Sequence, residues 1–168
     1  MKLAVIVVGR LKDGPERELT ERYAERAKAV GRALGFPAFQ LVEIPESRAR
    51  RDGDRRAEEG TAIIDKTASA VLVAFDERGK SLTSEVFAQR LAAWRDEGRA
   101  AVNFVIGGPD GLDERVRTAA DLVVSFSALT LPHQLARVLV VEQLYRALTI
   151  LAGHPYHRAG STEPDARS

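Results

Sequence analysis

The three histidines of this chain all fall in its last third, at positions 133, 154 and 157. Histidine is the side chain best suited to exchanging protons near neutral pH. Tyr156, His157 and Arg158 stand together near the C-terminus and offer stacking, acid–base and anion-binding groups. No third ligand or carboxylate lies at a suitable spacing, so we expect no metal site. The spacing predicts proton-transfer chemistry at this end of the chain.

Two loops precede these residues. The first reads GGPDG at 107–111, and its glycines would let a ligand approach the backbone closely. It has neither the Lys and Ser/Thr of a phosphate-binding P-loop nor the G-x-G-x-x-G spacing of a dinucleotide site. The second reads FSALTL at 126–131, where backbone groups beside an apolar wall would suit a flat heteroaromatic ring such as adenine. An ordinary turn and a packed connection are the alternative interpretations.

Short apolar runs alternate with helical segments along the chain. We expect strands at 3–8, 39–44, 70–75, 101–106 and 122–125, and helices at 15–34, 55–67, 83–97, 113–120 and 134–152. This alternation predicts a single α/β domain over residues 1–158, with a mostly parallel sheet flanked by helices. The small and polar tail at 159–168 is expected to be disordered.

The expected strand ends indicate where a ligand would bind. In open parallel sheets, ligands bind outside the carboxyl ends of the strands. Three such ends stand out, at Phe75–Asp76, at Gly107–Gly108, and from Ser125 onward. Asp76 is followed by a segment that contains Gly79, which we expect to form a turn. One small molecule could bridge all three loops.

The helix at 134–152 is apolar nearly all round. In a chain of this size such a helix needs two packing partners, and the sheet covers only one side. We therefore expect a second subunit on the other side, which predicts a homodimer. Glu142 and Arg146 are four residues apart and can pair along the helix. Arg137 is the better candidate for a functional arginine.

Overall charge gives little indication of a partner. The chain has 25 basic and 24 acidic side chains, a formal net charge of +1, and no cysteine. A nucleic acid would have to meet a local or composite patch. Residues 46–60 hold five arginines and five acids, and we favour a solvated loop leading into a helix over a basic edge that touches RNA. The apolar run at 3–8 is too short for a signal peptide or a membrane span, so we expect a cytoplasmic protein that does not meet a membrane.

Longer motifs resemble one known family closely. They are MKLAVIVVGRLK at the N-terminus, IGGPDGL at 106–112, SFSALTLPHQLARVLVVEQLYRA at 125–147 and HPYHR at 154–158. They resemble the 23S rRNA (pseudouridine-1915-N3) methyltransferases, small members of the SPOUT superfamily. The resemblance covers residues 1–158. This chain continues ten residues past Arg158, near which such chains usually stop.

The resemblance implies a homodimer whose C-terminal segments thread trefoil knots, with S-adenosylmethionine bound in each knot. The implied substrate is pseudouridine 1915 of 23S rRNA, methylated at N3 on the assembled ribosome. It implies that Tyr156, His157 and Arg158 lie near the partner subunit's cofactor. The implied cofactor contacts are Phe75, Gly107, Phe126, Ser127, Ala128, Leu129, Thr130 and Leu131.

A mechanistic hypothesis follows for the implied reaction. The N3 imide must lose its proton before or during attack on the methyl group, and we expect His157, or a water beside it, to take that proton. Arg158 and Arg137 would stabilise developing charge or hold phosphate, and Tyr156 could stack on the base. The alternatives are a related methyltransferase acting on tRNA or another rRNA nucleotide, a ribosome-binding protein without catalysis, and a small nucleotide-binding domain.

Overall fold

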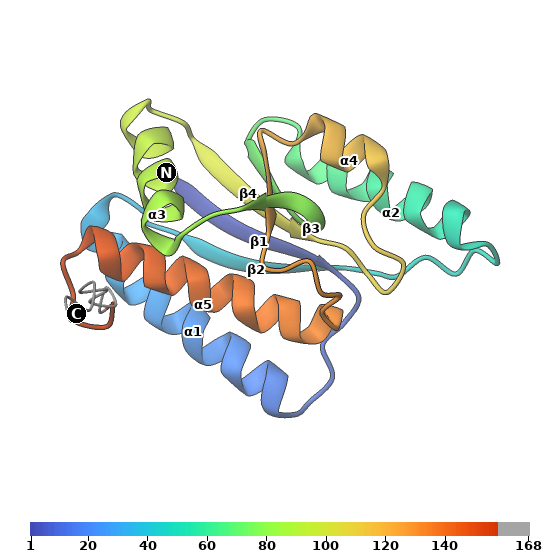
Figure 1. Ribbon diagram of the computed structural model, residues 1–168, viewed down its shortest axis with the longest axis horizontal. Helices are drawn as coiled ribbons and strands as arrows, with labels where there is room; N and C mark the ends of the chain where they lie inside the picture. Colours follow the sequence, from blue (N-terminus) through green and yellow to red (C-terminus); the bar gives the residue numbers. More distant parts are fainter. Residues whose placement is uncertain (158–168) are drawn as a thin grey trace, which may run out of the picture.

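Five parallel strands form one sheet in the computed structural model, which describes residues 1–157 (Figure 1). The strands are β1 (Lys2–Val8), β2 (Phe39–Ile44), β3 (Val71–Ser81), β4 (Ala101–Ile106) and β5 (Leu122–Ser125). They lie in the order β2-β1-β4-β3-β5, and every pairing is parallel. The α/β class and the parallel sheet predicted from the sequence are confirmed.

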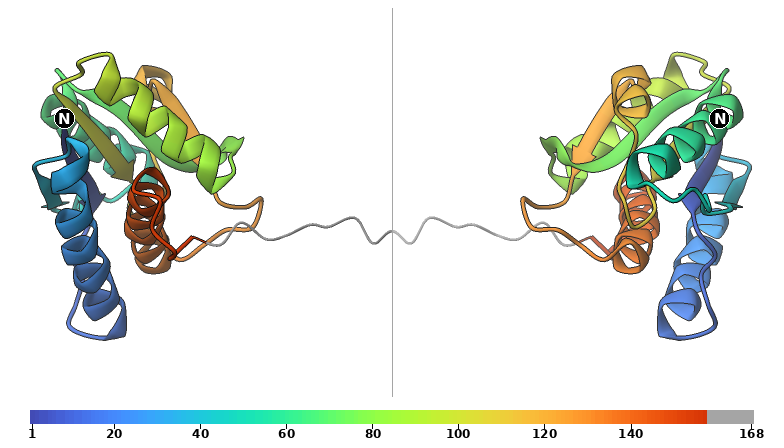
Figure 2. Two further views of the ribbon diagram at one scale, coloured as in Figure 1. Left: turned by 90° about the vertical axis from the view of Figure 1, so that its left-hand side faces the viewer. Right: turned by 90° about the vertical axis from the view of Figure 1, so that its right-hand side faces the viewer.

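Helices cover both faces of this sheet. The helices are α1 (Pro15–Gly31), α2 (Asp52–Thr67), α3 (Ser84–Asp96), α4 (Glu114–Ala119) and α5 (His133–Leu151), and a short 3-10 helix (Arg32–Leu34) follows α1. α1, α3 and α5 lie on one face, and α2 and α4 lie on the other (Figures 1 and 2). Three layers result, with a hydrophobic core on each side of the sheet.

Strand residues alternate between the two cores. In β4, Phe104 packs toward α1, α3 and α5, whereas Val105 packs toward α2 and α4. Both are fully buried. Because each face is covered by helices, the strands must be apolar on both sides, which explains the continuous apolar runs in the sequence.

α5 is buried along one side only. Val140, Leu144 and Leu148 are fully buried against α1, α3 and the sheet. On the opposite side, Leu135 and Leu139 are 47% and 37% exposed. The helix therefore keeps an apolar face that residues 1–157 do not cover.

β3 extends further than predicted. The segment after Asp76 was expected to be a turn, but the strand continues to Ser81. Phe75 and Lys80 both pair with Val124 of β5, so residues 76–79 bulge out and the chain then returns to the same partner strand. A Cβ atom on Gly79 would lie 2.6 Å from the carbonyl carbon of Val124. Glycine at 79 lets the returning strand lie directly against β5.

α2 begins earlier than predicted, at Asp52 rather than near residue 55. The Asp52 carboxylate accepts a hydrogen bond of 2.8 Å from the backbone N–H of Gly53. Asp52 and Asp54 place negative charge in the first turn, where the helix dipole favours it. Across residues 1–157, no helix is both long and apolar enough to span a membrane.

Candidate active site

A cavity of about 1050 Å³ opens at the carboxyl ends of β3, β4 and β5. This is the edge at which the sequence predicted a ligand. Seven of the eight residues predicted to contact a cofactor line it, whereas Ala128 is exposed and does not contribute to its wall. The seven are Phe75, Gly107, Phe126, Ser127, Leu129, Thr130 and Leu131.

Two aromatic rings form part of the apolar wall. Phe75 and Phe126 are stacked, with ring centroids 5.1 Å apart and planes 20° apart. Phe75 also contacts Phe104 of the core at a centroid distance of 6.5 Å. The wall therefore rests on the packed interior and not on a surface loop alone.

The 107–111 loop folds tightly at the end of β4. Gly111 has a φ of +82° and donates its backbone N–H to the carbonyl of Gly108 over 3.0 Å. A Cβ atom on Gly107 would lie 2.7 Å from the carbonyl carbon of Gly111. Since no side chain fits there, this part of the wall is bare backbone, which a ligand can approach closely.

Serine side chains shape the 126–131 loop. The Ser125 hydroxyl donates to the carbonyl of Ser127 over 2.8 Å and accepts from the backbone N–H of Ser127 over 3.2 Å. Ser127 in turn accepts from the N–H of Leu129 over 2.9 Å. Thr130 donates to Glu77 of the β3 bulge over 3.2 Å. The loop is thus held by local hydrogen bonds and by the bulged strand.

Charged residues form a rim that the sequence reasoning missed. Arg117 and Asp76 approach to 3.5 Å, and both line the cavity. Asp110 lines it too and pairs with Arg55 of α2, which holds the pKa of the Asp110 carboxyl below its usual range. The sequence placed Asp76 and the 107–111 loop, which contains Asp110, at strand ends, but it predicted no role for either carboxylate. No local pattern singles out Arg55 from its four neighbouring arginines.

His133 is another lining residue, at the first position of α5. Proline 132 precedes it in an extended conformation, so the histidine opens the helix at the cavity. Its place in the cavity wall was not anticipated.

Tyr156 and His157 lie at the opposite end of α5. His157 Nε2 is 2.7 Å from Glu85 Oε1, and the Tyr156 hydroxyl donates to Glu142 over 3.1 Å. Glu142 also accepts from Arg146 over 2.7 Å, so the predicted Glu142–Arg146 pair is confirmed. A helix of 19 residues is about 28 Å long. The structure therefore places the 126–131 loop and the Tyr156–His157 pair at opposite ends of one long helix.

Arg137 is 4% exposed and points toward the ends of β1 and β2. It donates to the carbonyl of Gly9 over 2.8 Å and pairs with Glu43 over 3.0 Å. Within residues 1–157, the cavity wall includes neither Arg137, Tyr156 nor His157. Arg158 lies outside the described residues. Three of the four residues expected to be catalytic therefore do not line this chain's own cavity.

The arginine-rich segment at 46–60 begins as an extended stretch and continues into α2. Arg48 and Arg50 are exposed, and neither forms an ion pair with another of residues 1–157. Arg51 pairs with Asp54 over 3.0 Å. The predicted loop leading into a helix is confirmed, and contact with RNA stays a prediction.

The fold is a parallel sheet with helices on both faces and a cavity at its carboxyl edge. Sequence comparison identifies the class of protein to which this fold and site belong. A family model described as "Predicted SPOUT methyltransferase" matches residues 1–157. The chain belongs to the SPOUT methyltransferase family.

Similar proteins narrow this assignment to the ribosomal RNA large subunit methyltransferase H branch of the family. The protein of that name from Methylobacterium radiotolerans is 61% identical over 160 residues, which cover 94% of this chain and 98% of that protein. The one from Methylorubrum extorquens strain PA1 is 56% identical over 168 residues, covering 99% of this chain and 100% of that protein. The resemblance predicted from the motifs is confirmed.

One solved structure has a similar fold, and at its low sequence identity it supports the fold and no other property. It is that of a probable methylase family protein from Haemophilus influenzae Rd KW20, which matches with a TM-score of 0.54 at 14% identity. The match covers 94% of this chain and 70% of that chain.

Proposed function

We propose that the protein transfers a methyl group from S-adenosylmethionine to N3 of a pseudouridine in 23S rRNA, at the position numbered 1915 in the family resemblance. The observation that carries this proposal is the convergence of Phe75, Gly107 and the 126–131 loop on one cavity. Relatives named for a large-subunit ribosomal RNA methyltransferase are 61% and 56% identical, and this likeness supports the substrate class. Such an activity belongs with ribosomes in the cytoplasm.

The cavity residues fit S-adenosylmethionine. Phe75, Phe126 and Leu131 would cover its adenine, and the bare backbone at Gly107 would accept close contacts. A volume of about 1050 Å³ leaves room for the cofactor and an incoming base. When bound, S-adenosylmethionine would supply a methyl group on a positively charged sulfur. The chain would contribute mainly alignment, by holding donor and acceptor in a fixed geometry.

The catalytic residues would come from the second subunit of a homodimer. Leu135 and Leu139 leave an apolar strip on α5, and Leu129 beside the cavity is 75% exposed. Contact through this strip would cover it and could bring the C-terminal residues of one subunit to the cavity of the other. This accounts for the position of Tyr156 and His157 away from the cavity of their own chain.

His157, or a water beside it, would take the N3 proton as the N–C bond forms and the C–S bond breaks. Glu85, 2.7 Å from Nε2, could orient the imidazole, and Nδ1 has no partner among the described residues. Arg158 would balance charge or hold phosphate, and Tyr156 would stack on the base. Arg137 is 4% exposed and paired with Glu43, so it would hold the ends of β1 and β2 in place and would not contact the RNA. A His157→Ala variant should lose most of its single-turnover rate on ribosomes. Full retention of that rate would exclude the histidine as the base.

We also propose the trefoil knot that the resemblance implies, formed by the segment that contains the 126–131 loop and α5. Family membership supports it. Pulling the chain by its ends in an optical trap tests it, because a knot shortens the length recovered on unfolding. Recovery of the full contour length would exclude the knot.

The activity itself is tested by mass spectrometry of 23S rRNA from strains with and without the gene. Loss of one methyl group at the pseudouridine, restored by the gene, is the expected result. Methyl transfer to purified ribosomes but not to bulk tRNA would separate this substrate from a tRNA. Calorimetry that detects no binding of S-adenosylmethionine would favour a ribosome-binding protein without catalysis.

A further inference from the structure

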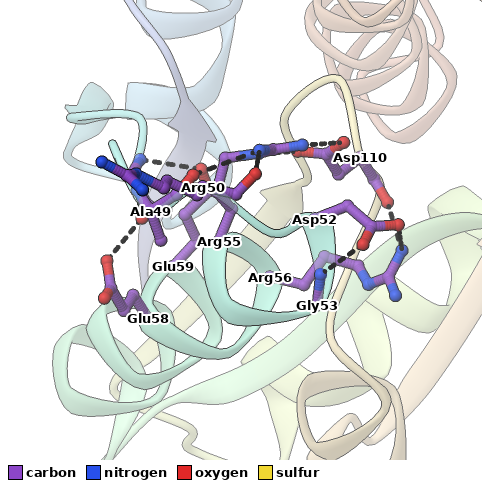
Figure 3. Close-up of polar contacts among 10 residues, drawn as sticks. Ala49, Arg50, Asp52, Gly53, Arg55, Arg56, Glu58, Glu59 and Asp110 are labelled. Carbon is purple, nitrogen blue, oxygen red and sulfur yellow. Dashed lines mark hydrogen bonds and ion pairs between the residues drawn. The ribbon is translucent and has the colours of Figure 1, made fainter.

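The guanidinium of Arg55, which lies on α2, contacts two other segments of the chain. Its Nε and Nη2 atoms donate to the two carboxylate oxygens of Asp110 over 2.6 and 3.0 Å (Figure 3). Its Nη1 atom donates to the backbone carbonyls of Ala49 and Arg50, over 3.1 Å in each case. One side chain on α2 thus ties the 107–111 loop to the extended stretch that precedes the helix.

This contact is stronger than an ordinary surface ion pair. The side chains of Arg55 and Asp110 are only 28% and 23% exposed, so water screens them incompletely. Two parallel hydrogen bonds between a guanidinium and a carboxylate fix both the orientation of the two groups and the distance between them. The hydrogen bonds from Arg55 hold the pKa of the Asp110 carboxyl below its usual range, because they stabilise the carboxylate.

The part of α2 that carries Arg55 is itself held in place by hydrogen bonds. One turn further along α2, the buried Glu59 accepts a hydrogen bond of 2.9 Å from the backbone N–H of Ser47. Glu58 hydrogen bonds to the hydroxyl of the same serine. The stretch at 47–50 and the first turns of α2 therefore form one connected unit. Arg55 extends from this unit to the apex of the 107–111 loop.

The opposite side of the loop packs closely against its neighbours. A Cβ atom on Gly108 would lie 3.0 Å from Cγ1 of Val8, and one on Gly107 would meet Gly111. The inner side of the loop is thus pressed against β1 and against itself. Its outer side, at Asp110, is fixed by Arg55.

We propose that Arg55 is a positioning residue for the methyl donor, which acts through Asp110 by holding the 107–111 loop in its binding conformation. This rests on the proposed function and adds to it a residue outside the cavity. Among residues 1–157, Asp110 lines the cavity and Arg55 does not, so Arg55 acts on a ligand only through the loop. Losing the pair allows the loop to sample other conformations, and binding must then restore order at a cost in affinity.

Calorimetry with S-adenosylmethionine on the full-length protein tests this role. Arg55→Ala should weaken binding about tenfold, because a partly buried bidentate pair is lost. Arg55→Lys should fall between Arg55→Ala and the wild type, since lysine can form one of the two bonds. On ribosomes, the KM for the methyl donor should rise by a similar factor, whereas kcat at saturating donor should change by less than about threefold.

A double-mutant cycle identifies the route. If Arg55 acts through Asp110, adding Arg55→Ala to Asp110→Asn should not weaken donor binding further. Additive losses from the two substitutions would overturn the proposal. Asp110→Asn also keeps the loop's size, so it remains informative if Arg55→Ala folds poorly.

Arg95 provides the matched control. Its side chain is 27% exposed, pairs with Asp96 and donates to the carbonyl of Leu34 over 2.9 Å, far from the cavity wall. Arg95→Ala should therefore change stability without changing donor affinity. Equal donor affinity in Arg55→Ala and the wild type would overturn the positioning role alone. Absence of donor binding in the wild type would overturn the proposed function together with it.

Discussion

Phe75 stacks on Phe126 with ring centroids 5.1 Å apart. This contact joins β3, just before its bulge at 76–79, to the loop that follows β5. The two strands also pair side by side, with Phe75 opposite Val124. The stacked rings therefore continue the sheet contact into the cavity wall. Any ligand that lies against this wall meets a surface fixed by the sheet.

Replacing Phe126 by leucine should weaken binding of S-adenosylmethionine about fivefold. An aromatic pair contributes about 1 kcal/mol beyond the area it buries, and leucine retains most of the volume but not the stacking. Phe126→Tyr is the matched control, because it keeps the ring and should bind nearly as well as the wild type. Calorimetry provides the measurement. Equal affinities for the leucine variant and the wild type would show that the stacked pair does not form the donor's wall.

The Gly79→Ala substitution should lower the free energy of unfolding by about 3 kcal/mol. The added Cβ would lie 2.6 to 2.8 Å from backbone atoms of Val124 and Ser125, none of which can move without opening the sheet. Gly53→Ala is the control, since a Cβ there meets nothing within 4 Å and removes a glycine from a helix. Urea unfolding should show a loss for the first variant and a small gain for the second. Comparable stability of the Gly79 variant and the wild type would contradict the close approach of β3 and β5.

Local patterns were sufficient to predict most elements, and long-range contacts explain the differences. The runs at 39–44, 101–106 and 122–125 became strands with those bounds. The run at 101–106 is suited to burial on both faces, because it is apolar and lies inside the sheet, whereas 39–44 forms an edge strand with exposed residues. The second half of β3, with Lys80 and Ser81, is polar and follows Gly79. Its strand conformation depends on a second pairing with β5, which no local pattern contains.

The sequence predicted the loops of the candidate site, but it did not predict the long-range contacts around them. Loops at the ends of parallel strands must lie together, so 107–111 and 126–131 could be placed at one cavity from their positions in the sequence. The contact between Arg55 and Asp110 could not, because 55 residues separate them and five arginines compete for the same acid. Residues 154–157 follow a helix that carries them away from the cavity, which the sequence order alone does not reveal.

Glu59→Gln should stabilise the protein at alkaline pH and have little effect at acidic pH. Burial raises the pKa of Glu59, and its Oε2 atom has no hydrogen-bond partner among the described residues. In the pH range between its unfolded and its folded pKa, the native state holds the proton and the unfolded state releases it. The contribution of this group to stability is therefore complete below the unfolded pKa and is lost as the pH rises through the folded pKa.

Glutamine at 59 removes that proton linkage while retaining an acceptor for Ser47. Urea unfolding should be measured at several pH values. At alkaline pH, the free energy of unfolding of the variant should exceed that of the wild type by on the order of 1 kcal/mol. A difference that does not vary with pH would indicate that Glu59 does not titrate differently in the two states. Glu18→Gln, at an exposed position on α1, is the control for removing a surface carboxylate.

Reversing the charge of Arg48 and Arg50 together should weaken binding to ribosomes and reduce its dependence on salt. Both side chains are exposed, and they flank Ala49, whose carbonyl accepts from Arg55 beside the cavity rim. Loss of two phosphate contacts should lower the slope of log affinity against log salt by up to about two. Arg22→Glu, on an exposed part of α1, is the control. Unchanged binding and salt dependence would leave residues 46–60 as a solvated segment without an RNA contact.

Introducing glutamate at Leu135 and Leu139 should yield a folded monomer without methyltransferase activity. The two leucines are 47% and 37% exposed on one side of α5, and a second subunit that covers them could not accommodate two buried carboxylates. Leu19→Glu is the matched control, because Leu19 is 37% exposed on α1 and lies outside the expected interface. Sedimentation should show a dimer for the control and a monomer for the α5 variant.

The loss of activity follows from where α5 places its two ends. The helix begins at the cavity with His133 and ends at Leu151, and Tyr156 and His157 contact α3 and α5 instead of the cavity of their own chain. If a second subunit must supply these residues, a monomer holds the methyl donor but lacks the groups that act on the base. Calorimetry on the variant should then detect donor binding, while methyl transfer to ribosomes falls below detection. Full methyl transfer by a variant that sediments as a monomer would show that one chain contains a complete site.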